Sequence, residues 1–167
     1  SSDIKAIRMA DALPNGFNPT SDNTISISGS THPATYIWFD NTDDAGILYV
    51  YTSADKVRMN TDSSRAFRSN IALTDISGIA NWDTSTITNM SYLFTNCPAI
   101  ISLHSLENWD TSNITNLYLA FGIGSTAYNN GMRSQLSDIS ALANWDTSSA
   151  TSFQCMLQYT TSLTSLH

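Results

Sequence analysis

The stretch NWDTSTITNM at residues 81–90 occurs again as NWDTSNITNL at residues 108–117 and as NWDTSSATSF at residues 144–153. Trp82 and Trp109 are 27 residues apart, and self-similarity at such a period is typical of stacked supersecondary units. Each copy lies inside a longer apolar pattern, so the repeat first of all predicts a repeated structural unit.

Apolar residues precede each tryptophan in steps of three and follow it in a helix-like stripe. In the first copy these residues are Leu73, Ile76 and Ile79 before Trp82, and Ile87, Met90 and Phe94 after it. Such a pattern fits neither a plain amphipathic helix nor an alternating strand. We therefore predict one strand, one turn and one short helix per unit, with the tryptophans in the core and the helices beginning near Thr88, Thr115 and Thr151.

Stacking of these units predicts an α/β protein, specifically a leucine-rich-repeat-like, right-handed solenoid of about three short coils over residues 71–167. Phe67 precedes the first coil at the spacing found in the later ones, which indicates a degenerate coil before it. Leu163 and Leu166 begin a further coil, so we expect that more repeats or another chain cover this end.

Residues 1–70 differ in composition and are predicted to form an N-terminal α+β cap. Residues 3–13 space their apolar side chains at helical intervals, which predicts a helix. The aromatic and β-branched residues 34–40 and 46–52 predict two antiparallel strands, and residues 24–28 predict a third.

Composition excludes several classes of partner. Seven basic residues against fourteen acidic ones give a formal net charge of −7, so neither nucleic acid nor an anionic membrane is an expected partner. The chain has no apolar run long enough to span a bilayer and no signal-peptide pattern. We expect no membrane insertion in this segment and a soluble, mature or trimmed chain.

The repeat NWDTSNITNL, together with YIWFDN at residues 36–41 and ILYVYTSADKVRMNTDSSRAF at residues 47–67, resembles the BspA-like leucine-rich-repeat surface proteins of Gram-positive bacteria and mycoplasmas. The resemblance covers residues 34–167. The third unit departs from it at Ala150 and Ser152. The resemblance implies a secreted or wall-anchored protein of the bacterial cell surface that adheres to host or extracellular-matrix proteins.

The repeated aspartates Asp83, Asp110 and Asp146 are the first candidates for chemistry. We interpret them as closing their own DTS turns by accepting backbone N–H bonds, and a calcium ladder is the weaker alternative. The histidines His32, His104 and His167 form no pair with metal-ligand spacing. No nucleophile elbow, phosphate loop or pair of catalytic carboxylates is present, so we predict no enzyme, no cofactor and no metal.

Cys97 and Cys155 occupy different positions in their units and are separated by a whole coil. Two coil steps exceed the distance that a disulfide spans between Cα atoms. We predict two free thiols.

Two groups of residues are candidates for binding. Nine extra residues lie within residues 122–135 and include Tyr128, Met132 and Arg133, which are residue types enriched at protein interfaces. An idle surface loop is the alternative interpretation of this insertion. The second group is the polar face of the predicted strands, which carries Asp75, His104 and Asp138.

Together with what the resemblance implies, these observations predict a non-enzymatic, extracellular binding or adhesion module of a bacterial surface protein, which recognises a host or matrix protein. Two alternatives stay open. One is a structural stalk or spacer repeat, and the other is a carbohydrate-binding solenoid.

Overall fold

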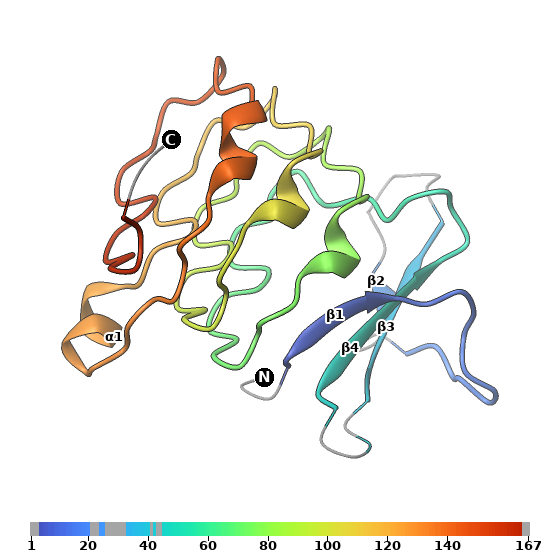
Figure 1. The fold of residues 1–167 in the computed structure, drawn as a ribbon. Helices are drawn as coiled ribbons and strands as arrows, with labels where there is room; N and C mark the ends of the chain where they lie inside the picture. Colours follow the sequence, from blue (N-terminus) through green and yellow to red (C-terminus); the bar gives the residue numbers. More distant parts are fainter. Residues whose placement is uncertain (1–3, 21–23, 26–32, 41, 43–44, 165–167) are drawn as a thin grey trace.

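The structure, a computed structural model, describes residues 4–20, 24–25, 33–40, 42 and 45–164. One β-sheet near the N-terminus packs beside a stack of short turns, and the C-terminal part of the chain lies at the far end of that stack (Figure 1). Predictions that concern Asp3, residues 26–28, His32, Leu166 and His167 lie outside the described residues.

The sheet has four strands in the order β1-β4-β3-β2. The strands are β1 (Ala6–Met9), β2 (Thr24–Ile25), β3 (Thr35–Asp40) and β4 (Ile47–Thr52). Antiparallel pairing of β3 with β4 confirms the two strands predicted from aromatic and β-branched residues, and β2 pairs antiparallel with β3.

The predicted N-terminal helix is wrong, because Ala6–Met9 forms strand β1. This strand pairs parallel with β4 on one side, and on the other Ala6 forms a parallel bridge with Asp75 of the first repeat. Apolar spacing cannot reveal these two distant partners, and they override the local helical pattern. No α-helix lies in the described part of residues 1–70, so the α+β description of the cap is also wrong.

The predicted α/β, leucine-rich-repeat-like solenoid is wrong as well. The described repeats contain isolated single-residue bridges in place of strands. Their helical pieces are the 3-10 helices η2 (Ser77–Ile79), η3 (His104–Leu106) and η4 (Ser140–Asn144). A 3-10 helix has three residues per turn, so the apolar step of three that suggested a strand is the period of these helices.

The second half of each unit is not helical either. Asn89, Asn116 and Ser152 form successive parallel bridges where helices were predicted. Three residues further on, Tyr92, Leu119 and Cys155 adopt left-handed backbone with φ of 61°, 51° and 61°. An L-residue in this region interrupts right-handed helical backbone, so the segment forms a series of turns.

Backbone hydrogen bonds connect equivalent residues of successive repeats. Thr88 N donates to Thr61 O over 2.9 Å, Thr115 N to Thr88 O over 2.8 Å, and Thr151 N to Thr115 O over 2.9 Å. The threonine hydroxyls donate to the same three carbonyl oxygens. This column satisfies backbone groups that turns alone would leave unpaired.

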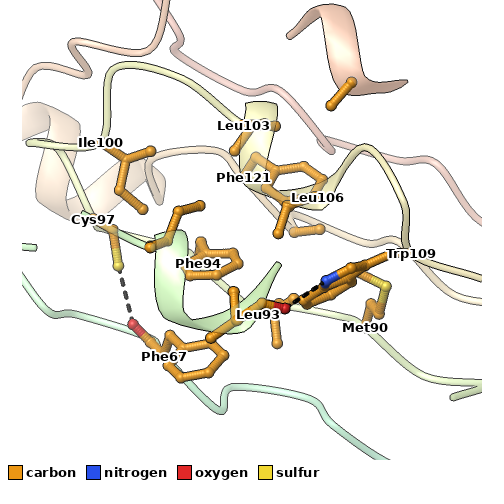
Figure 2. Close-up of a cluster of buried hydrophobic side chains, with 14 of the residues drawn as sticks. Phe67, Met90, Leu93, Phe94, Cys97, Ile100, Leu103, Leu106, Trp109 and Phe121 are labelled. Atoms are coloured by element: carbon orange, nitrogen blue, oxygen red, sulfur yellow. Dashed lines mark hydrogen bonds between the residues drawn. The ribbon is translucent and has the colours of Figure 1, made fainter. Parts of the chain in front are cut away.

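The tryptophans pack into the core, as predicted from their register with the apolar residues. Trp109 and Trp145 are buried, and Trp82 is half-buried against the same cluster. The indole Nε1 of Trp109 donates to Ile79 O over 3.0 Å (Figure 2). That of Trp145 donates to Leu106 O over 3.1 Å. Each buried indole thus pairs with the end of the 3-10 helix in the preceding repeat.

A phenylalanine column runs beside the tryptophans. The rings of Phe67 and Phe94 stack with centroids 5.0 Å apart, and those of Phe94 and Phe121 stack at 6.2 Å. This stacking confirms that Phe67 belongs to a unit before the first full repeat. Cys97 lies beside the column and donates through Sγ to Phe67 O (Figure 2).

Both cysteines are free thiols, as predicted. Cys97 is buried, and this burial raises the pKa of its thiol to about 11. It therefore behaves as a small apolar side chain with a weak donor.

Gly78 marks the place where the sheet meets the repeats. A Cβ atom there would lie 2.4 Å from the Ile7 carbonyl oxygen in β1. The equivalent positions of the next two repeats, Ser105 and Ala141, carry side chains, and β1 contacts neither η3 nor η4. One core cluster contains residues of the sheet and of all three repeats, and the division at residue 70 stays a prediction.

Candidate protein-binding surface

The repeated DTS aspartates close turns, as predicted. The Oδ1 atoms of Asp83, Asp110 and Asp146 each accept the backbone N–H of the serine two residues later, over 3.2, 3.1 and 2.9 Å. Within the described ranges, no group of three His, Cys, Asp or Glu side chains is arranged to hold a metal ion. The aspartate column therefore supports turn geometry.

A second polar column holds the starts of the 3-10 helices. Asp75 Oδ1 accepts from Ser77 N over 2.8 Å, and Asp138 Oδ1 accepts from Ser140 N over 3.0 Å. In the second repeat, Ser102 takes the equivalent place and accepts from the next helix through Oγ. Two of the predicted binding residues, Asp75 and Asp138, thus lie at the same position of different repeats.

The carboxylates of Asp75 and Asp138 are occupied by further internal partners. Arg8 Nη2 of β1 lies 2.5 Å from Asp75 Oδ2, and this bond lowers the pKa of Asp75 to about 2. Ser102 Oγ donates to Asp138 Oδ2 over 2.5 Å, and this bond and the Ser140 N–H lower the pKa of Asp138 to about 2. Both side chains stabilise the stacking of neighbouring segments.

Of the three candidate residues on this face, His104 has the most exposed side chain. It begins η3, which lies between η2 and η4 in the stack (Figure 1), and its side chain is 74% exposed. Its Nδ1 lies 3.3 Å from Glu107 Oε2. A partner could reach the imidazole without displacing a core contact.

The nine-residue insertion contains a short helix that side-chain contacts hold against the repeats. Helix α1 (Ser125–Asn129) projects from the stack (Figure 1). The Tyr128 ring stacks on the Tyr159 ring of the third repeat, with centroids 4.0 Å apart and planes 9° apart. Arg133 Cζ lies 4.1 Å from the centroid of the Tyr128 ring. Because Tyr159 covers one face of that ring, the guanidinium covers the other.

Further hydrogen bonds attach the insertion to the repeats on both sides. Gly124 N donates to Asn96 Oδ1 of the preceding repeat over 2.8 Å. Gln158 Nε2 of the following repeat donates to Ser125 Oγ over 3.0 Å. The insertion is thus held at its start and along α1, and it presents a defined surface.

The three predicted insertion residues lie together, but they differ in what they offer. Tyr128 is half-buried between its two neighbours. Met132 is half-buried and Arg133 is exposed, with Nη1 donating to the carbonyl oxygens of Tyr128 and Met132 over 2.8 Å each. Arg133 and Met132 are therefore the residues that can contact a partner, and Tyr128 supports them.

The sequence analysis did not identify the partners of three candidate residues. Tyr159 stacks on Tyr128, Arg8 pairs with Asp75, and Ser102 donates to Asp138. Ser102 was open to detection, because it occupies the position of Asp75 and Asp138 in the repeat. Tyr159 and Arg8 carry no such signal, since they pair with residues that are distant in the sequence and outside the shared pattern.

No helix in the described residues has the length and apolar character needed to cross a bilayer. No curated protein and no solved structure matches the chain. A family model matches residues 61–166, which begin at the threonine that starts the inter-repeat hydrogen-bond column and include all three copies of the repeat. This match covers more than half of the chain, which therefore belongs to the family described as Mycoplasma protein of unknown function, DUF285.

Proposed function

We propose that this chain is a non-enzymatic, extracellular binding module of a BspA-like bacterial surface protein, and that it adheres to a host or extracellular-matrix protein. The observation that carries the proposal is the stack of Tyr159, Tyr128 and Arg133. It fixes the segment inserted between the second and third repeats as a surface with an exposed cation.

The chemistry of this surface suits protein recognition. Arginine and methionine are enriched at protein interfaces, and a guanidinium donates two parallel hydrogen bonds to a carboxylate. Packing against Tyr128 restricts the Arg133 side chain before a partner arrives, which lowers the entropy cost of binding. We therefore place the contact at Met132 and Arg133, with a carboxylate of the partner opposite the guanidinium.

The polar face at the 3-10 helices offers one further exposed group. Asp75 and Asp138 are engaged within the chain, whereas His104 is exposed. We propose His104 as a peripheral contact, because isolated exposed groups contribute less than a buried anchor.

The test measures binding of the purified chain to immobilised fibronectin, laminin, collagen and fibrinogen, and in parallel to a glycan array. We expect at least one matrix protein to bind. The Arg133→Ala and Met132→Ala variants should each weaken that binding about tenfold or more, as interface anchors do. Arg68→Ala is the matched control, because Arg68 is also exposed and also lies near a tyrosine ring.

If both variants bind as tightly as the parent, the contact does not lie at Met132 and Arg133 and this part of the proposal is wrong. Loss of binding in the Arg68→Ala variant would indicate a general effect of charge. A chain that binds sugars and no matrix protein would contradict the proposal, as would one that binds neither, which is the behaviour expected of a spacer.

A further inference from the structure

A cavity of about 370 Å³ lies between the inner face of the sheet and the first turns of the repeat stack. One wall comes from the strands, through Ile7, Ile37, Leu48 and Val50. The opposite wall comes from the segment that precedes the first full repeat and from its neighbours: Val57, Met59, Phe67, Asn70, Leu73 and Trp82. This size and mostly apolar lining are typical of small-molecule sites.

Asn70 lines the cavity and has one polar atom that the protein leaves unsatisfied. Asn70 is 7% exposed, and its Nδ2 donates to Phe67 O over 2.8 Å. Its Oδ1 is buried and has no hydrogen-bond partner, and within the described ranges no other buried side-chain nitrogen or oxygen lacks one. An unpaired buried acceptor costs free energy, and a bound donor would recover it.

Comparison within the repeat shows that the asparagine is not required for stacking. Asn70 and Cys97 each follow a core phenylalanine by three residues. Cys97 donates to the same carbonyl oxygen of Phe67 and adds no acceptor that lacks a partner. Asn70 therefore carries an acceptor beside the cavity that its bond to Phe67 O does not use.

The cavity opens to solvent on one side. Asn60, Asp62 and Ala66 line it and are exposed, whereas Val50, Phe67 and Leu73 at its other end are buried. A ligand can enter past the exposed residues and place its apolar body against the buried ones. A charged group at the buried end would lose its hydration without a counter-ion, so the ligand is uncharged there.

We propose that this cavity is a binding site for a small, uncharged molecule that has an apolar body and one hydroxyl or N–H group, which donates to Asn70 Oδ1. The site is separate from the surface at Met132 and Arg133. It requires neither a partner protein nor a second copy of the chain.

The test uses p-cresol and 4-methylanisole, which share one apolar body and differ in a single donor. Binding is measured from NMR shifts of the backbone amides of Phe67, Asn70 and Leu73 during titration of each probe. We expect p-cresol to bind about tenfold more tightly than 4-methylanisole, the ratio that one net hydrogen bond provides. In the Asn70→Leu variant the two probes should bind equally.

A second variant does not depend on how well Asn70→Leu folds. Ala66→Leu adds bulk at the exposed mouth of the cavity and should weaken p-cresol binding, whereas Ala143→Leu, an exposed site in the third repeat, should leave it unchanged. The proposal is overturned if neither probe shifts these amides, or if both bind the parent equally, as when an ordered water satisfies Asn70. Binding that is insensitive to Ala66→Leu would also overturn it.

Discussion

Gly78→Ala tests the contact between strand β1 and the first repeat. The new Cβ would lie 2.4 Å from the Ile7 carbonyl oxygen and 2.8 Å from Arg8 Cα, both of which are backbone atoms. Bringing the shorter contact to 3.0 Å requires β1 to move away by about 0.6 Å. Gly78 has no positive φ, so alanine fits its backbone and the clash is the only new element.

The expected loss of stability follows from what that movement disturbs. Ile7 N donates to Asp75 O over 3.0 Å, and Lys5 O accepts from Thr74 N and Asp75 N over 2.9 and 3.1 Å. Overpacking of this kind costs about 1–3 kcal/mol, and each weakened hydrogen bond adds about 0.5–1.5 kcal/mol. Loss of the glycine's freedom in the unfolded chain returns up to about 1 kcal/mol. We therefore expect a net loss of about 2–4 kcal/mol.

Urea unfolding followed by circular dichroism measures this loss, and amide exchange at Ile7 reports whether β1 has detached. The matched control is Ser105→Ala at the middle of η3, where the free energy of unfolding should change by less than about 0.5 kcal/mol. If Gly78→Ala is as stable as the parent, β1 does not pack on η2 in the way described.

Substitutions at three further positions test other parts of the structure. Trp109→Ala should cost about 3–5 kcal/mol in urea unfolding, since it leaves a cavity and removes the donor to Ile79 O, and a variant as stable as the parent would contradict the core role of the tryptophans. Asp75 has a pKa of about 2 in the folded chain, below the ordinary value of about 3.9, so its ionised form stabilises the fold above about pH 4 and this contribution is lost as the pH falls toward 2. The difference in melting temperature between parent and Asp75→Asn should therefore shrink over that range, and a constant difference would exclude the Arg8 pairing as its cause. Ser69 has a φ of 62°, so Ser69→Val should cost about 1–3 kcal/mol whereas Ser69→Gly should cost less, and equal losses in both variants would argue against the left-handed backbone.

Local composition and repeat register predicted part of this structure. Strands β3 and β4 were predictable because their residues favour extended backbone and a polar loop separates them. The Trp and Phe columns and the Asp turns were predictable because three copies of one unit place the same residue in the same environment.

The remaining features depend on contacts between distant residues. The strand character of Ala6–Met9 comes from β4 and Asp75, and an apolar step of three fits a 3-10 helix as well as it fits other turns. The stack of Tyr128 on Tyr159 and the cavity at Asn70 have the same origin. The residues that form the tyrosine stack and the cavity come together only when the repeats stack in order. A pattern within one sequence does not show which distant residues will meet.

The position of β1 also constrains the order of assembly. Residues 6–9 are made before both of their neighbours, which are β4 on one side and Asp75 on the other. Strand β1 can therefore pair with β4 only after residue 50 has been made, and with the first repeat only after residue 75 has been made. Contacts of such long sequence separation slow folding, and an unpaired strand that waits for them is a site for misassembly. Removing Ala6–Met9 should thus disturb the completed fold more than it disturbs the formation of the later repeats, which pair with their own neighbours in sequence.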